Sequence, residues 1–154
     1  MGTKYQGSPE AVRALNTYIK LQRAAETVLT RTNAHLSAYD LTTSQFGVLE
    51  ALYHLGTLSQ RDLAEKVLKS TGNISTLLKG LEARGLITRE RDRADNRYMQ
   101  VCITDAGRVL IAHVLPQHVA GIVADLSVLT PDEQDELGRL CRKLGLRGAF
   151  SDDV

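Results

Sequence analysis

The sequence has 154 residues, of which 43% are hydrophobic and 24% charged, and its formal net charge is +1. This length suits one folded domain (1–154) with its own core, and this composition excludes a disordered chain. The two cysteines are too few for a disulfide framework, and no apolar run has the length of a signal peptide or a membrane span, so we expect a cytoplasmic protein without a membrane partner.

The charged residues are unevenly distributed along the chain. Residues 60–97 contain nine basic and six acidic side chains, a net charge of +3, whereas residues 104–154 contain five basic and eight acidic ones, a net charge of −3. A positive middle segment is typical of a protein that meets a polyanion, although solvated charged faces give the same pattern. With no Trp and two Phe, stacking on single-stranded nucleic acid is not expected.

A long first helix is predicted over about residues 9–39. Ser8 is suited to cap it, Pro9 to occupy its first position, and apolar residues repeat at helical spacing as far as Leu36. No Gly or Pro interrupts this pattern, and an unbroken helix of this length spans about 45 Å. Such a long helix in a small domain commonly packs against a second subunit.

Three shorter helices follow. Thr43 is expected to cap the first of them, Ser59 the second, and a helix over residues 71–84 ends before Gly85, which suits a left-handed C-cap. Only residues 68–70 separate the last two of these helices. Two short amphipathic helices with so tight a link predict a helix-turn-helix.

The sequence period then changes from helix to strand. Residues 86–91 and 98–103 predict two strands, and the polar residues 92–96 between them predict a turn. Two further helices are expected, one at about 104–127 with Thr104 as its cap and one at 131–145 with Thr130 as its cap. The predicted fold is therefore mainly α, a winged helix-turn-helix with six helices and a small β-hairpin wing.

The helix at 71–84 is the candidate recognition helix. Hydroxyl, amide and ammonium groups alternate with its apolar positions, and such groups bind base edges in the major groove or phosphates at a helix N-terminus. A polar solvated face is the alternative interpretation. The candidate DNA-binding residues here are Ser70, Thr71, Asn73, Ser75, Thr76 and Lys79.

The predicted wing is rich in arginine, a residue suited to phosphates and to a narrow minor groove. Arg89, Arg91, Arg93 and Arg97 lie within nine residues, and Asp95 is placed to orient the Arg97 guanidinium. A charged hairpin that only prevents edge aggregation is the alternative. Next to a helix-turn-helix, DNA binding is favoured, with Arg91, Arg93, Asp95 and Arg97 as candidate contacts.

These segments, taken in their order and spacing, resemble the MarR family of bacterial regulators. The resemblance covers about residues 9–145, and it is carried by residues 41–49, 59–64, 73–87, 95–97 and 101–107. It implies a homodimer formed by the N- and C-terminal helices (about 9–39 and 104–145) around a DNA-binding lobe (about 41–103). It also implies a palindromic operator, repression, and release by a small ligand.

In the family, the arginine of the wing Asp-x-Arg motif enters the minor groove, which the resemblance carries over to Asp95 and Arg97. This wing holds additional arginines, so Arg93 is an alternative tip contact.

The signal that controls the protein is less well defined by the sequence. Family members that sense oxidants use a cysteine near the start of the first helix, whereas here the cysteines are Cys102 and Cys141, so redox sensing is not expected. His113 and His118 are five residues apart and do not share a helix face, so no metal site and no cofactor are expected. A small organic effector remains, with Tyr18, His35, Tyr39, His54 and His113 as candidate lining residues.

Three functions compete on the sequence. A ligand-responsive DNA-binding repressor is favoured, and the arginine-rich wing argues against a winged helix that binds protein instead. A thiol- or metal-responsive regulator is a further alternative. An enzyme is not expected, because no nucleophile–base set, phosphate loop or metal spacing occurs in the chain.

Overall fold

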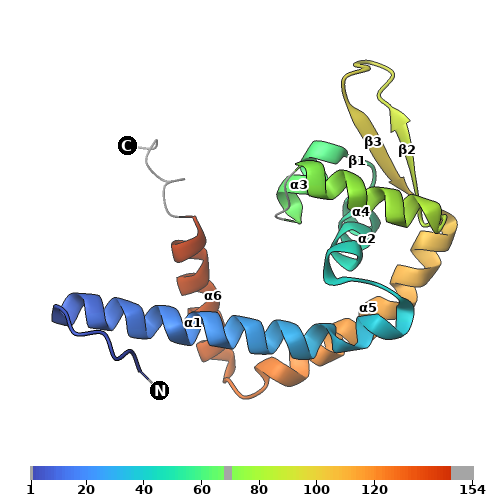
Figure 1. Ribbon diagram of the computed structural model, residues 1–154. Coiled ribbons are helices and arrows are strands. Elements are labelled where there is room, and N and C mark those ends of the chain that lie inside the picture. Colours follow the sequence, from blue (N-terminus) through green and yellow to red (C-terminus); the bar gives the residue numbers. More distant parts are fainter. Residues whose placement is uncertain (1, 68–70, 147–154) are drawn as a thin grey trace.

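The computed structural model of the protein describes residues 2–67 and 71–146 (Figure 1). Within these ranges the chain forms six α-helices, one 3-10 helix and three short strands, which confirms the predicted winged helix-turn-helix. In chain order the elements are α1 (Pro9–Asn33), η1 (Ala34–Tyr39), α2 (Thr43–Leu55), β1 (Leu58–Ser59), α3 (Gln60–Lys66), α4 (Thr71–Ala83), β2 (Ile87–Arg91), β3 (Met99–Ile103), α5 (Asp105–Leu126) and α6 (Pro131–Gly145).

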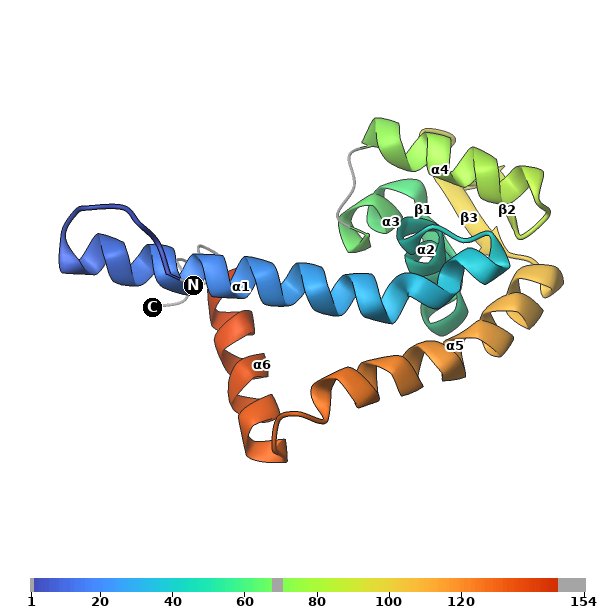
Figure 2. The same ribbon diagram turned by 60° about the horizontal axis from the view of Figure 1, so that its bottom comes forward.

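The long helices and the winged helix occupy different parts of the molecule. α1 and α5 pack against each other, and Arg31 of α1 pairs with Asp125 of α5 at 3.4 Å. The elements from α2 to β3 form a compact lobe at one end of this pair, and the β2–β3 hairpin projects away from it (Figures 1 and 2). α6 turns back from the end of α5 towards α1 (Figure 2).

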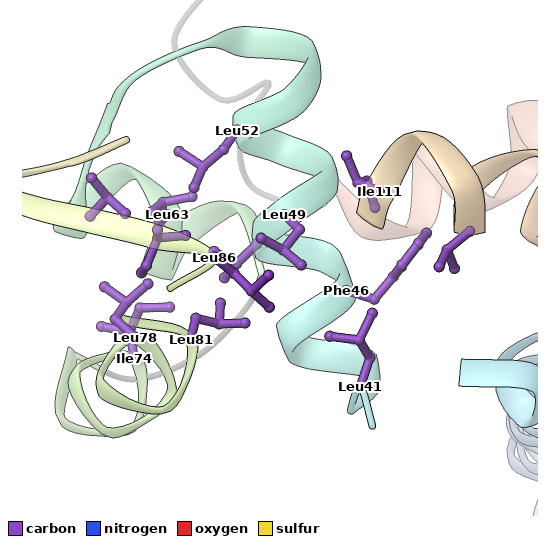
Figure 3. Close-up of a cluster of buried hydrophobic side chains, with 14 of the residues drawn as sticks. Leu41, Phe46, Leu49, Leu52, Leu63, Ile74, Leu78, Leu81, Leu86 and Ile111 are labelled. Atoms are coloured by element: carbon purple, nitrogen blue, oxygen red, sulfur yellow. The ribbon is translucent and has the colours of Figure 1, made fainter. Parts of the chain in front are cut away.

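One hydrophobic core joins the lobe to the long helices (Figure 3). Leucines of α2 and α3, such as Leu49 and Leu63, meet the apolar face of α4 in its centre, and all are fully buried. Ile111 of α5 and Leu36 of η1 belong to the same core. The lobe is therefore continuous with α5 and cannot move against it without disturbing packed side chains.

Most predicted helix starts are confirmed because a cap is a local feature of the chain. The predicted caps at Ser8, Ser59, Thr104 and Thr130 each accept a hydrogen bond from a first-turn backbone amide. Gly85 has the predicted left-handed backbone, with φ at +69°. Ser70, the residue before the start of α4 at Thr71, lies outside the described residues.

The cap of α2 differs from the prediction by one residue. Thr42, not Thr43, is the cap: its hydroxyl accepts from the Gln45 amide at 3.1 Å, and the Gln45 side chain accepts from the Thr42 amide at 3.0 Å. The buried side chains of Leu41 and Phe46 flank this capping box and belong to the same core cluster. The apolar residue before the cap therefore fixes the register of the helix start, as in a hydrophobic staple.

The predicted first helix is shorter than expected. α1 ends at Asn33, and residues 34–39 form the 3-10 helix η1 before Asp40 takes a left-handed backbone, with φ at 52°. The amides of Asp40 and Leu41 close this segment on the carbonyls of Ser37 and Leu36. Leu36 is buried in the core, as its place in the apolar pattern suggests, but that uninterrupted pattern did not indicate the change from α- to 3-10 geometry.

A third strand, β1, was not predicted. Leu58 and Ser59 pair with Val101 and Gln100 of β3, so the strand order is β1-β3-β2. β2 and β3 pair from Ile87↔Ile103 to Arg91↔Met99. Two residues are too few to show an alternating pattern, yet this strand attaches the wing to the start of α3.

α5 is more apolar than the sequence analysis allowed. Its length and a mean hydropathy of 1.5 are those of a helix that could cross a membrane, contrary to the expectation that no run approaches a span. Ile111 and Val114 on one side of α5 are buried in the core. Val119 and Val123 remain exposed, so a large apolar surface of this helix is uncovered in the single chain.

Candidate nucleic-acid interface

The outer face of α4 carries most of the predicted recognition residues. Ile74 and Leu78 are fully buried, whereas Thr76 and Lys79 are exposed and Ser75 is half-buried. Asn73 is also exposed, and Gly72 has open space above its backbone. The structure therefore brings these predicted residues together on one helix face.

Two predicted contacts of this helix are only partly described. Thr71 begins α4, but its side chain and the whole of Ser70 lie outside the described residues.

The wing turn is held by one aspartate. Asp92 Oδ1 accepts hydrogen bonds from the amides of Ala94 and Asp95 at 2.7 and 3.0 Å, and its Oδ2 accepts from Gln100 at 2.7 Å. The Asp95 amide and the Gln100 side chain thereby lower the pKa of Asp92. The wing turn is fixed by an ionised carboxylate, although the sequence marked Asp92 only as a polar turn residue.

Asp95 holds Arg97 as the sequence predicted. Arg97 Nη2 donates to Asp95 Oδ2 at 2.8 Å, Nε donates to Oδ1 at 3.0 Å, and the Arg97 amide also donates to Oδ1 at 3.0 Å. These bonds lower the pKa of Asp95 and raise that of Arg97. Because 84% of the Arg97 side chain is exposed, the carboxylate orients the guanidinium without covering it.

The other wing arginines divide into two kinds. Arg91 and Arg93 are exposed, and Arg91 Nη1 donates to the Asn96 carbonyl at 2.9 Å within the turn. Arg89 instead turns inward to Glu82 of α4, with Nη2–Oε2 at 2.6 Å and only 16% of its side chain exposed. Arg89 lowers the pKa of Glu82 and joins the wing to α4, so it is not a free phosphate contact.

The candidate effector residues do not form one site. Two of them, in η1, each contact a histidine of α5: Tyr39 meets His113 edge-on with ring centroids 5.7 Å apart, and His35 meets His118 with ring centroids 5.3 Å apart. Tyr18 lies away from them in a groove between α1 and α6.

His54 lines a separate hollow of about 610 Å³. Leu29 of α1, the outer face of α2 and the end of α3 enclose it, and Glu50 and Lys66 bring opposite charges to its wall. The hollow lies between α1 and the lobe.

Neither a metal site nor a redox site was expected from the sequence. Residues 2–67 and 71–146 contain no group of three or more His, Cys, Asp or Glu side chains arranged to hold a metal ion. Cys102 is half-buried with its sulfur 3.2 Å from the Thr57 hydroxyl, and Cys141 is exposed on α6.

Comparison with known proteins connects this geometry to a family. A MarR family model matches residues 39–97, from the end of η1 to Arg97 of the wing. The HTH-type transcriptional regulator YkoM of Bacillus subtilis is 31% identical over 137 residues, which are 89% of this chain and 89% of YkoM. The chain belongs to the MarR family.

Two further MarR-type comparisons extend over most of the chain. The HTH-type transcriptional regulator MhqR of Bacillus subtilis is 30% identical over 87% of this chain and 92% of MhqR. The structure of Bordetella bronchiseptica BpsR, whose DNA binding is regulated by 6-hydroxynicotinic acid, superposes with a TM-score of 0.76 and 26% identity over 84% of this chain and 98% of BpsR. This MarR-family chain is therefore a DNA-binding transcription regulator.

Sequence reasoning missed how α4 is held. Glu82 and Arg89 pair across the turn between α4 and β2, and Arg84 bonds to residues more than forty positions earlier in the chain. The Arg84 contacts join residues far apart in the chain, and the Glu82–Arg89 pair crosses from a helix to a strand, so no local pattern indicated either contact.

Proposed function

We propose that the protein is a repressor that binds a palindromic operator as a homodimer and is released by a small organic ligand. In this proposal α4 enters the major groove, where Asn73, Ser75, Thr76 and Lys79 meet base edges and phosphates. Arg97 and the exposed Arg91 or Arg93 reach the neighbouring minor groove. The observation that carries the proposal is the exposed Arg97 guanidinium, held in a bidentate pair by Asp95 on the wing that follows α4.

The homodimer is supported by apolar residues that a single chain leaves exposed. They concentrate on the long helices and α6, outside the lobe: Tyr18, Leu21, Leu29, Val109, Val119, Val123, Leu137, Leu140 and Leu144. An apolar groove of about 350 Å³ also runs between α1 and α6. Large exposed apolar patches commonly mark an interaction surface, and a second copy that covers these side chains with the same helices gives a two-fold dimer.

The effector is proposed to bind between the lobe and the long helices. The hollow lined by Leu29, Glu50, His54 and Lys66 combines apolar walls with a few polar groups, the usual character of a small-molecule site. The regulation of BpsR by 6-hydroxynicotinic acid supports a small organic ligand for this chain. We further propose that the protein works in the cytoplasm, on chromosomal DNA, and by binding alone without catalysis.

Selection from a pool of random duplexes tests this function. The purified protein is expected to enrich an inverted repeat whose half-sites are about one helical turn apart. The logarithm of its binding constant is expected to fall linearly with the logarithm of the salt concentration. Enrichment of a single, unrepeated site contradicts the dimer. If the selection enriches no sequence and the affinity for DNA does not depend on salt, DNA recognition by this face is contradicted.

A further inference from the structure

The C-terminal end of α4 is tied to the junction between α1 and α2 by one side chain. Arg84 directly follows the last residue of α4, and its Nη1 donates to the Asp40 carbonyl at 2.6 Å while Nη2 donates to the Tyr39 carbonyl at 3.1 Å. These carbonyls lie at the end of η1, where a helix has no further amides of its own to satisfy them. A planar guanidinium matches two such acceptors, and its charge suits the negative end of a helix.

Tyr39 continues this connection to α5. Its hydroxyl donates to Gln117 Oε1 at 3.1 Å, and its ring contacts His113 edge-on. Because Gln117 and His113 both lie in the middle of α5, the end of α4 is linked through η1 to a long helix. In Figures 1 and 2 the end of α4, η1 and the first turns of α5 lie on the same side of the molecule.

The same end of α4 is also fixed to the wing. Glu82, two residues before Arg84, pairs with Arg89 of β2 at 2.6 Å. The two contacts leave in different directions, one to the wing and one to η1. α4 is thereby fixed at its C-terminal end, while its N-terminal half carries most of the DNA contacts predicted on this helix.

The inner face of α4 is packed in the core through Ile74, Leu78 and Leu81, so the helix turns as a rigid body together with the side chains packed against it. A turn about its C-terminal end displaces its N-terminal end the most. Ala83 and Thr71 are twelve positions apart in the helix, a distance of about 18 Å, so a rotation of about 10° at the C-terminal end moves the N-terminal end by about 3 Å. That displacement is close to the rise of one base pair, about 3.4 Å. A small change in the angle between α4 and α5 is therefore enough to change which half-site spacing a dimer fits.

We propose that Arg84 is a positioning residue for DNA recognition. It sets the angle of α4 against α5 by holding the two carbonyls of η1, and so selects the spacing between the half-sites of the operator. Arg84 contacts no DNA in this role. The inference rests on the proposed dimeric DNA binder, and it concerns specificity for spacing instead of the affinity of each half-site.

The first experiment compares spacing preference. Wild type, Arg84→Ala and Arg84→Lys are titrated against the selected inverted repeat and against versions with one base pair added to or removed from the spacer. Wild type is expected to favour one spacer by about tenfold, the cost of a single misfit position. Arg84→Ala is expected to lower that preference to about threefold or less, and Arg84→Lys to fall between, because one ammonium cannot make the bidentate fork.

Controls separate positioning from simple loss of charge. Arg108→Ala removes the same charge from an exposed position in the first turn of α5 and is expected to keep the wild-type spacing preference. Arg84→Ala is also expected to keep the wild-type salt slope, since a residue that contacts no phosphate releases no counterion. An unchanged spacing preference in Arg84→Ala overturns the proposal, and so does a lower salt slope.

Hydrogen exchange tests the anchor without DNA. Arg84→Ala is expected to accelerate exchange at the amides of Asp40 and Leu41, which close η1, while Arg108→Ala leaves them unchanged. If random duplexes yield no inverted repeat, the proposed dimeric function fails and exchange still decides whether Arg84 anchors η1. Unchanged exchange in Arg84→Ala overturns the proposal whatever the DNA result.

Discussion

Asp95→Asn separates two explanations of the wing. If the total charge of the wing governs DNA binding, removing one negative charge from each protomer strengthens it. If binding instead needs Arg97 held in place, the same substitution weakens it. In the wild type the Arg97 amide donates to Asp95 Oδ1 at 3.0 Å, and the side-chain oxygen of asparagine can accept the same bond, so the turn is preserved. The ion pair between Arg97 Nη2 and Asp95 Oδ2, at 2.8 Å, is lost.

The structure gives the size of each effect. Arg97→Ala removes one phosphate-region contact per protomer, so the salt slope of a dimer falls by about 1.8. Between 50 and 200 mM salt, the advantage of wild type over Arg97→Ala therefore shrinks by about twelvefold. Asp95→Asn leaves Arg97 able to reach the DNA, so we expect a slope close to wild type and binding roughly two- to twelvefold weaker per protomer, the cost of ordering a freed side chain.

Fluorescence anisotropy with a labelled, selected duplex at several salt concentrations measures both quantities. Asp135→Asn removes the same charge from an exposed position on α6 and is expected to bind like wild type. Tighter binding by Asp95→Asn at every salt concentration would refute the orienting role and support the charge explanation. A salt slope unaffected by Arg97→Ala would remove Arg97 from the DNA interface.

Three further predictions concern stability, measured by urea denaturation at a fixed protein concentration. Gly107→Ala is expected to destabilise by about 1–3 kcal/mol, because its Cβ would overlap the Leu86 carbonyl, whereas Gly138→Ala, which has open space, should stabilise by about 0.5–1 kcal/mol. Leu49→Ala is expected to cost about 2–5 kcal/mol, because Leu49 is fully buried in the core; a cost below 1 kcal/mol would contradict its central place. Burial lowers the pKa of His118 below its ordinary value of 6.5, so the unfolded chain binds this proton first as the pH falls. The free energy of unfolding should therefore be highest above pH 6.5 and should fall as the pH drops from 6.5 to the lower pKa that His118 has in the folded protein. His118→Gln should make this fall smaller.

Local features of the chain were predictable because neighbouring residues determine them. Ser8 and Thr130 each combine a capping side chain with a following proline and acidic first-turn residues, and both begin helices as predicted. Asp95 and Arg97 are two residues apart in a turn, so their pairing also follows from sequence spacing. Predictions of this kind need no knowledge of the rest of the fold.

Features that depend on distant contacts were not predictable in the same way. α1 was expected to continue to residue 39, but the tertiary requirement to bury Leu36 and Leu41 favours a 3-10 segment instead. β1 exists because β3 offers its second edge to Leu58, which no local pattern indicates. The candidate effector residues were chosen by type alone, and the fold distributes them over three places.

The basic residues show why a charge count is a poor measure of a DNA-binding surface. Of the nine basic residues in 60–97, Arg84 and Arg89 bind within the protein, Arg61 pairs with Glu65 at 3.4 Å, and Lys66 lines the hollow beside α1. Lys69 lies outside the described residues. The exposed face of α4 and the wing is left with four: Lys79, Arg91, Arg93 and Arg97. If each of these meets one phosphate in both protomers, the salt slope is about −7, whereas all nine would give about −16. A measured slope near the smaller value would mean that the internal contacts of Arg84 and Arg89 persist on DNA, so that these two arginines shape the interface instead of joining it.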